Sequence, residues 1–288
     1  MTEVEKRQIA EQLRQFSERV GSQNKTARML DGVSTATVSK ILTGKWETIG
    51  DEMWRGIAAK IGGTTDEWHI VTTEAFLRMQ FIMQNAKDGS QVMGVTGFAG
   101  GGKSEAIKHF ASTTKNVYHL MCSEYWNRPT FIQQLMKAMG LRYGGTQADQ
   151  MEEIIEELKC ADHPLIILDE ADKLRDQVLY FFITLYNELE GSCGIILCAT
   201  DYLRKRIERG LRISKKGYEE IYSRLGRKFI QLQVINDEDI RRVCIGNGVT
   251  DPEVIAAITR EADSDLRRVK RAIWATRRTQ SCELKVKS

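Results

Sequence analysis

The stretch that decides the fold lies at residues 91–104 and reads QVMGVTGFAGGGKS. An apolar segment over residues 92–96 leads into a loop that fits G-x-x-x-x-G-K-[ST], and residues 105–111 have the character of a helix. Glycines allow positive φ and turn successive N–H groups toward phosphate oxygens, and the start of the next helix adds further free N–H groups. A glycine-rich turn that merely precedes a lysine would lack this strand–loop–helix context. The stretch therefore predicts a nucleotide site.

The polar residues of this loop each have an expected role. Lys103 would reach the β- and γ-phosphates of ATP, and Ser104 would bind Mg²⁺. The glycines would supply backbone N–H groups to the phosphates. Together with an aspartate further along the chain, these residues form the expected nucleotide-binding set: Gly97, Gly100, Gly101, Gly102, Lys103, Ser104 and Asp169.

A second apolar run, over residues 164–168, ends in two acids, Asp169 and Glu170. In a parallel sheet covered on both faces, such a run is a buried strand whose carboxyl end opens onto the site. Asp169 would hold the Mg²⁺–water shell together with Ser104, and Glu170 would act as the general base that orients the attacking water. A strand followed by an acidic helix cap is the plainer alternative. The phosphate loop upstream favours the catalytic interpretation.

Two further segments add candidate catalytic groups. A buried strand over residues 194–200 ends at Thr200, whose hydroxyl could touch the γ-phosphate or the lytic water. Residues 222–229 place Arg224 and Arg227 just before a short strand at 229–234. An arginine there can complete a neighbouring subunit's site, because its fork donates to phosphate oxygens. We choose Arg224 as this finger, and a structural salt bridge is the alternative for either arginine.

Length and composition bound what surrounds the site. A chain of 288 residues allows two or three domains, and a net charge of +3 with 28% charged residues describes an ordinary, slightly basic protein. Nucleic-acid contact must therefore come from local patches. Six scattered cysteines without a C-x-x-C pair favour reduced core thiols over a metal site. Without an apolar run of transmembrane length or a signal-peptide pattern, we expect a cytoplasmic protein that does not bind membranes.

The N-terminal segment has the pattern of a helical domain. An amphipathic helix is expected over residues 5–20, and residues 22–45 resemble a phage-repressor-type helix-turn-helix. Gly32 can make the tight turn, to which Asp31 adds one residue, and Ser34 can cap the second helix. A small protein-interaction domain is the alternative. If the second helix enters the major groove, the residues that face DNA are Thr35, Ala36, Thr37, Ser39 and Lys40.

A basic cluster between residues 203 and 217 offers a second place for DNA. Its seven lysines and arginines face a single acid, Glu208. Such a cluster suits phosphate backbones, whereas a solvated mobile loop is the plainer interpretation. The expected DNA-contacting residues here are Arg204, Lys205, Arg206 and Arg209.

These patterns predict an α/β protein with three parts. A helix-turn-helix domain at 1–63 is followed by a parallel-sheet P-loop core at 64–230 and a small helical lid with a tail at 231–288. The boundary is placed at the flexible residues 62–65. Within the core, the sequence predicts a helix at 73–86 that packs on the sheet, a strand at 116–121, and helices at 129–139 and 146–159.

The chain resembles the AAA+ ATPases, and more closely the transposition regulators of the phage Mu protein B type. The resemblance rests on the domain order, the run Leu168-Asp169-Glu170-Ala171-Asp172, the Ser223-Arg224 box and the short lid. It implies that Thr200 is sensor 1, although asparagine is often found there, and that Arg267 is sensor 2. Residues 169–172 also spell a helicase tetrapeptide, but such helicases need two tandem nucleotide-fold domains, for which this chain has no room.

The resemblance also implies a function. A protein of this type is a phage or mobile-element ATPase of the bacterial cytoplasm that hydrolyses ATP to ADP and phosphate, stimulated by DNA and by oligomerisation. It would form a filament or ring on double-stranded DNA without strong sequence preference and deliver that DNA to a transposase for DNA recombination. Two alternatives remain open. One is an ATP-switched, site-specific DNA-binding regulator, and the other is a secretion or signalling ATPase whose N-terminal domain binds protein.

Overall fold

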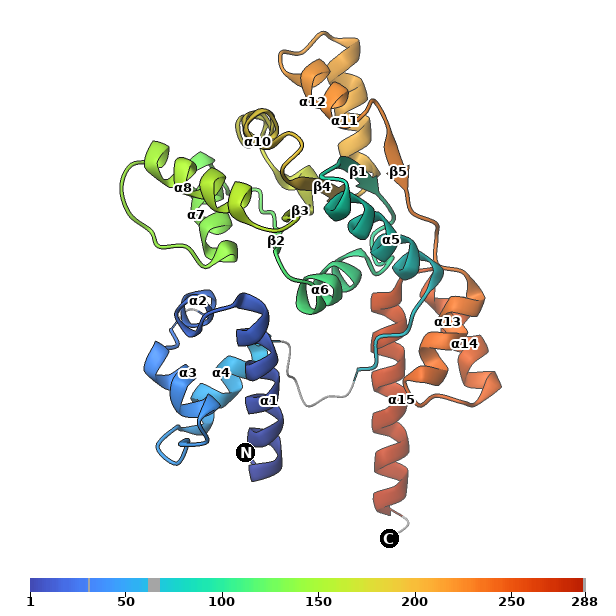
Figure 1. The fold of residues 1–288 in the computed structure, drawn as a ribbon. Coiled ribbons are helices and arrows are strands. Elements are labelled where there is room, and N and C mark those ends of the chain that lie inside the picture. Colours follow the sequence, from blue (N-terminus) through green and yellow to red (C-terminus); the bar gives the residue numbers. More distant parts are fainter. Residues whose placement is uncertain (31, 62–67, 287–288) are drawn as a thin grey trace.

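The computed structural model describes residues 1–30, 32–61 and 68–286, with the side chains of residues 59 and 279–286 left aside. Figure 1 shows a central sheet flanked by helices, a group of N-terminal helices below one side, and a long C-terminal helix below the other. The domain boundary expected at 62–65 and the extra turn residue Asp31 lie outside the described residues.

Four helices form the N-terminal part: α1 (Glu3–Val20), α2 (Gln23–Met29), α3 (Thr35–Leu42) and α4 (Asp51–Ile61). Their core buries Leu13, Val38 and Trp54 completely. Ser34 caps α3, since its hydroxyl accepts a hydrogen bond from the Thr37 N–H at 3.0 Å. The two helices expected on either side of the turn are therefore present, and whether they contact DNA stays a prediction.

Five parallel strands form the sheet: β1 (Val92–Thr96), β2 (Val117–Met121), β3 (Leu165–Asp169), β4 (Gly194–Ala199) and β5 (Phe229–Gln231). Their order is β2-β3-β4-β1-β5. Thr96 is aligned with Ala199, and Met121 with Asp169, so the carboxyl ends share one edge. Strands β3 and β4 are buried along their whole length, as expected for strands covered on both faces. The predicted parallel α/β fold is confirmed.

Helices cover both faces of this sheet: α5 (Glu74–Asp88), α6 (Lys103–Thr113), α7 (Arg128–Met139), α8 (Gln147–Cys160), the 3-10 turn η1 (Ala171–Lys173), α9 (Asp176–Leu179) and α10 (Phe181–Leu189). Alternate residues of β3 face opposite sides, because Ile166 joins the cluster under α7, α8 and α10, and Ile167 joins the cluster under α5 and α6. The helix predicted at 73–86 is present as α5, although Phe81 on its surface is 56% exposed. Residues 203–217 contain helices, so the alternative of a mobile loop there is wrong.

Beyond the central strands, the chain continues through α11 (Asp201–Arg212), α12 (Tyr218–Arg224), β5, α13 (Asp237–Gly246), α14 (Pro252–Ala262) and α15 (Leu266–Val286). The last three helices share a core that buries Ile240, Val269 and Ile273. They form the helical lid that the sequence predicts. Within residues 1–30, 32–61 and 68–286, no helix combines the length and apolar character that a membrane span requires.

The cysteine thiols are mostly in the core, as expected. Four are free and buried, while Cys160 is exposed, contrary to the expectation. The side chain of Cys282 lies outside the described part. The buried four are Cys122, Cys193, Cys198 and Cys244.

Candidate nucleotide-binding site

The phosphate loop turns sharply between β1 and α6, and its glycines are required there. Gly100 and Gly102 have φ of 76° and 81°, in the left-handed region that side chains with a Cβ rarely adopt. A Cβ on Gly100 would also lie 2.0 Å from Oδ1 of Asp265 in the lid. Gly102 is the N-cap of α6 and has no side chain to cap the helix. The first N–H groups of α6 therefore stay available to an anion.

Lys103 at the start of α6 points back over the loop. Its ammonium donates to the carbonyl oxygens of Gly97 at 2.8 Å and Phe98 at 2.7 Å. Burial lowers the pKa of Lys103, although the nearby charges of Asp169 and Asp172 act in the opposite direction. An ammonium has three N–H donors, so the lysine can serve a phosphate from this position with only a local adjustment.

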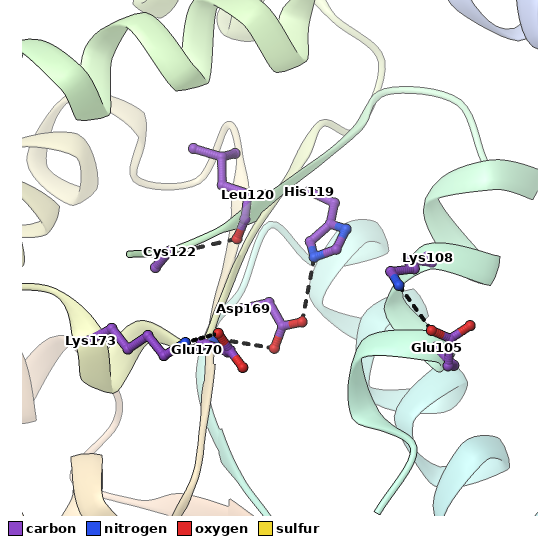
Figure 2. A network of polar contacts seen from close by, with 8 residues as sticks. All are labelled: Glu105, Lys108, His119, Leu120, Cys122, Asp169, Glu170 and Lys173. Carbon is purple, nitrogen blue, oxygen red and sulfur yellow. Dashed lines mark hydrogen bonds and ion pairs between the residues drawn. The ribbon is translucent and has the colours of Figure 1, made fainter. Parts of the chain in front are cut away.

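Asp169 ends β3 and is only 1% exposed. Its Oδ1 accepts the Glu170 N–H at 3.0 Å, while Oδ2 has no hydrogen-bond partner within the described residues. His119 Nε2 lies 3.5 Å from Oδ2, which is long for a hydrogen bond, and Figure 2 shows the two side chains pointing toward one another. Burial alone would raise the pKa of Asp169, but His119 and Ser104 outweigh it and the pKa is lowered.

The Asp169 carboxylate and the Ser104 hydroxyl fit Mg²⁺. A buried, ionised carboxylate oxygen without a partner is costly unless a ligand satisfies it. Ser104 acts directly on the pKa of Asp169, so its hydroxyl lies beside that carboxylate. Mg²⁺ is usually held by one or two protein oxygens together with water and substrate phosphates. Accordingly, the described chain has no group of three or more His, Cys, Asp and Glu residues that could hold a metal by itself.

Glu170 follows Asp169 at the carboxyl edge of the sheet. Its backbone has φ of 55°, a left-handed conformation that is uncommon for a residue with a side chain and often marks a functional position. Its carboxylate pairs with Lys173 Nζ at 2.5 Å, on the other side of the strand end from His119 (Figure 2). This pairing raises the pKa of Lys173. Glu170 is thus at the expected place, and Lys173 is a partner that the sequence did not reveal.

Thr200 lies at the end of β4 and its hydroxyl donates to Asp172 Oδ2 at 2.7 Å. The same hydroxyl caps α11. Asp172 is therefore a site residue that sequence reasoning missed as such. The available signal was the third acid of the run at 169–172, which lies three residues after Asp169 and returns toward β4 through the turn η1.

The lid contributes Arg267, whose neighbour Leu266 makes a backbone contact to the loop. The Leu266 N–H donates to the Gly100 carbonyl at 3.0 Å, and the Arg267 N–H donates to Asp265 Oδ1 at 2.8 Å. The charge of Arg267 is close enough to Lys103 to lower the pKa of that lysine. The expected sensor arginine thus begins α15 directly beside the phosphate loop.

Arg224 is separate from this group. Its guanidinium donates twice to Asn187 Oδ1, at 2.9 and 3.2 Å, and lies 5.4 Å from the ring centre of Tyr186 on α10. Glu220 is 3.5 Å away. Arg227 is exposed and its side chain has no hydrogen-bond or ion-pair partner among the residues described. The structure brings together all the expected catalytic residues except Arg224.

The candidate DNA residues divide into two helices. On α3, Thr35, Ala36 and Lys40 are exposed, and Thr37 and Ser39 are half-buried. On α11, Lys205 and Arg209 are exposed, and both Arg204 and Lys205 pair with Asp201, at 2.7 and 3.3 Å.

Arg206 behaves differently from its neighbours on α11. Its guanidinium donates to Leu174 O at 2.7 Å, to Asp172 O at 3.2 Å and to the Tyr218 hydroxyl at 3.0 Å, and it pairs with Asp176. Burial opposes ionisation of Asp176, but Lys215 and Arg206 lower its pKa to about 2. Arg206 is therefore a structural residue, and the expectation that it faces DNA is corrected.

Comparison with known proteins agrees with this geometry. Residues 86–207 match the family described as "AAA domain". The central domain has the AAA+ fold. The crystal structure of Cdc6p from Pyrobaculum aerophilum is similar, with a TM-score of 0.54 and 13% sequence identity over 75% of this chain and 65% of that chain. This chain thus spans less than two thirds of the length of Cdc6p, and the likeness concerns the fold alone. Among curated proteins, no match is found.

Proposed function

We propose that this AAA+ protein hydrolyses ATP, assembles on double-stranded DNA and delivers that DNA to a transposase, as the resemblance to the phage Mu protein B type implies. The ATPase part is supported by one observation. The glycine loop and the buried Asp169 Oδ2, which has no hydrogen-bond partner among the described residues, both lie at the same edge of the sheet. This arrangement supports a site for a triphosphate with Mg²⁺, because loop N–H groups and a cation would meet the phosphates together.

The residues of the edge divide the work of hydrolysis. Lys103 and the loop N–H groups would bind and orient the β- and γ-phosphates, and Ser104 and Asp169 would hold Mg²⁺. When bound, Mg²⁺ supplies positive charge against the phosphate oxygens. Glu170 would release Lys173, orient a water in line with the γ-phosphate and accept its proton. In this scheme the Asp172–Thr200 pair positions the hydroxyl that faces this water.

An oligomer is proposed because the candidate finger, Arg224, contacts Asn187 and Tyr186 and no residue of its own phosphate loop. Arg224 lies on α12, away from the residues around its own phosphate loop, and would donate to the γ-phosphate of a neighbouring subunit. Its contacts to Asn187 and Tyr186 would hold the guanidinium in a fixed direction. An arginine fixed in this way gives up little freedom when it meets a phosphate.

The DNA part of the proposal rests on exposed side chains of two helices, most of them polar or basic. Thr35, Ala36 and Lys40 on α3, together with Lys205 and Arg209 on α11, are accessible to a duplex. Because residues 22–45 resemble a helix-turn-helix whose second helix would be α3, an ATP-switched regulator of one operator is the second candidate. Single base changes separate the two, since they cost about 1–3 kcal/mol each in sequence-specific binding and almost nothing in backbone binding.

The test measures ATP-dependent retention of mixed-sequence duplex DNA by the wild-type protein and by Lys103→Ala. We expect tight binding with a slowly hydrolysed ATP analogue, weak binding without it, and neither nucleotide nor DNA binding in Lys103→Ala. Unchanged nucleotide affinity in the variant would contradict the site. Wild-type protein that binds ATP but no DNA at low salt would support the protein-binding secretion or signalling alternative.

A further inference from the structure

Helix α15 carries a dense run of positive charge on the lid. Residues 266–278 contain six lysines and arginines and no acid. The helix extends away from the sheet in Figure 1, beside α13 and α14. Its apolar residues Val269 and Ile273 are 0% and 1% exposed, because they pack into the lid core. Most of these charges therefore belong to the sides of the helix that the lid leaves uncovered.

The basic residues of α15 fall into two groups. Two are used by the fold: Lys270 lies 5.0 Å from the ring centre of Trp68, and Arg277 donates to the Asn247 carbonyl at 2.9 Å. Arg267 belongs to the nucleotide site. The other three arginines are exposed and follow the helical repeat with one half-exposed tryptophan. This exposed group, which we name the α15 basic face, consists of Arg268, Arg271, Trp274 and Arg278.

The α15 basic face has unused binding capacity. Within the described residues, the guanidinium groups of Arg268 and Arg271 have no hydrogen-bond or ion-pair partner. Arg278 stacks on Trp274, with 4.6 Å to the ring centre, and Trp274 is 50% exposed. Arg271, Trp274 and Arg278 lie at spacings of three and four, which aligns them along one side of the helix. At about 1.5 Å per residue, the face extends for about 15 Å.

We infer that the α15 basic face binds the phosphate backbone of double-stranded DNA, as a contact surface additional to α3 and α11. Arginine forks match phosphate oxygens, and a duplex carries about one negative charge per 1.7 Å of its axis, so a face of this length spans several phosphates. The indole of Trp274 adds an N–H donor and holds the Arg278 guanidinium. This inference rests on the proposed DNA binding and extends it to a surface outside the nucleotide core.

An anionic membrane is the less suitable partner for the same charge. A helix that binds a bilayer surface inserts an apolar side between the lipids. In α15 that side is occupied by the lid, since Val269 and Ile273 are buried. Trp274 is the one large apolar side chain that its described outer surface offers. The observations thus favour a polyanion that needs charge and hydrogen-bond donors without an apolar interior.

The same helix connects this face to the nucleotide site. The first turn of α15 is attached to the phosphate loop by the hydrogen bond from Leu266 to Gly100 and by the packing of Asp265 on Gly100. The position of α15 relative to the core therefore depends on the loop that binds phosphate. We expect DNA binding at the α15 basic face to be stronger with the ATP analogue than without nucleotide.

The experiment compares wild-type protein with the triple variant Arg268→Ala/Arg271→Ala/Arg278→Ala, using fluorescently labelled mixed-sequence duplex DNA and the ATP analogue. The matched control is Arg241→Ala/Arg242→Ala, which removes two exposed lid arginines that already pair with Glu238. Each lost phosphate contact lowers the slope of log K against log salt by about 0.9, so the triple variant should lose about 2–3 in slope and on the order of tenfold or more in affinity at low salt. The control should retain the wild-type slope.

A second readout uses the wild-type face itself. Trp274 should change its fluorescence when DNA is added, and Trp274→Phe should remove that change while ATP-analogue binding stays intact. A triple variant with wild-type affinity and slope, and an unresponsive Trp274, would overturn the inference and leave the proposed function standing. Wild-type protein that binds no DNA would overturn both. Binding of phosphatidylserine vesicles through these arginines, without DNA binding, would assign the face to membranes and overturn the inference.

Discussion

The carboxyl edge of the sheet and helix α11 each hold a charged side chain away from water, and they differ in how that charge is satisfied. At the edge, Asp169 is buried and one of its oxygens lacks a partner, so the fold leaves charge unsatisfied where a ligand belongs. On α11, Arg206 is half-buried, and each of its three guanidinium nitrogens donates to a group of its own chain. A buried charge with an open partner position indicates a site, whereas one with a complete set of partners indicates a structural role.

Arg224 gives the strongest test of this comparison, because it has partners in its own chain and yet is proposed to act on the ATP of a neighbouring subunit. Loss of an arginine finger costs roughly 10³–10⁵ in rate in phosphoryl transfer. We expect Arg224→Ala to lose ATPase activity on this scale while it still binds ATP. Steady-state phosphate release at high protein concentration measures the effect, and Arg227→Ala serves as the exposed control. A normal rate in Arg224→Ala would place this arginine with Arg206 as a structural residue.

Glu170 tests the catalytic edge directly. Glu170→Gln keeps the shape of the side chain but removes the base, so hydrolysis should fall on the order of 10²–10⁴-fold while ATP binding persists. DNA complexes formed with ATP should then be long-lived. Single-turnover hydrolysis and nucleotide binding separate the two effects. Hydrolysis at the wild-type rate would show that Glu170 only pairs with Lys173 at the start of the turn η1.

Changes to the Asp172–Thr200 contact should have a smaller effect on ATP hydrolysis. Asp172→Asn keeps a hydrogen-bond acceptor for the Thr200 hydroxyl, whereas Thr200→Val removes the hydroxyl. We expect Thr200→Val to lower kcat about tenfold or more with little change in KM, since the group positions a water without binding the substrate. Asp172→Asn should retain most of the activity. A rise in KM for ATP at constant kcat would assign the pair to nucleotide binding.

Arg206 and Asp176 provide the opposite case. Removing the Asp176 charge should change the stability of the fold, and this charge has no direct part in ATP hydrolysis. The folded pKa of Asp176, about 2, is below its ordinary value of 3.8. Its ion pairs therefore stabilise the fold fully above pH 3.8, and this contribution disappears as the pH falls through about 2. Asp176→Asn should lower the free energy of unfolding by about 1–2 kcal/mol at neutral pH, after allowance for its partial exposure.

Denaturant unfolding of wild-type protein and Asp176→Asn across this range checks the prediction. The difference between the two should shrink below pH 3.8, toward the folded pKa of about 2. A difference that stays constant with pH would mean that the carboxylate acts through packing alone.

What the sequence predicted well was local. The glycine loop and the buried strand that ends at Asp169 can be recognised because apolar runs, positive-φ glycines and terminal acids lie next to one another in the chain. The parallel order of the strands then gathers these ends at one edge. Ser34 as a helix cap was predictable for the same reason, since the cap and the N–H that it accepts are three residues apart.

What the sequence did not reveal depends on contacts between distant residues. Arg206 was grouped with its basic neighbours because nothing local shows that Asp176, thirty residues earlier, lies beside it. The helical character of α11 was missed for a different reason, because its signal is local: Leu203 and Ile207 are buried at a helical spacing of four. Asp172 could be read as part of an acidic run, but its partner Thr200 comes from another strand. Phe81 is a large apolar residue of the kind that usually lies in a core, but its side chain is exposed.

The central claim is that ATP is hydrolysed at a site completed by a second subunit. The most direct test mixes Arg224→Ala with Lys103→Ala, neither of which should hydrolyse ATP alone. A Lys103→Ala subunit still carries Arg224 and can lend it to the intact phosphate loop of an Arg224→Ala neighbour, so the account predicts partial recovery of ATPase activity in the mixture, increasing with protein concentration and with DNA. A mixture that stays inactive although the two variants are shown to assemble together would contradict it.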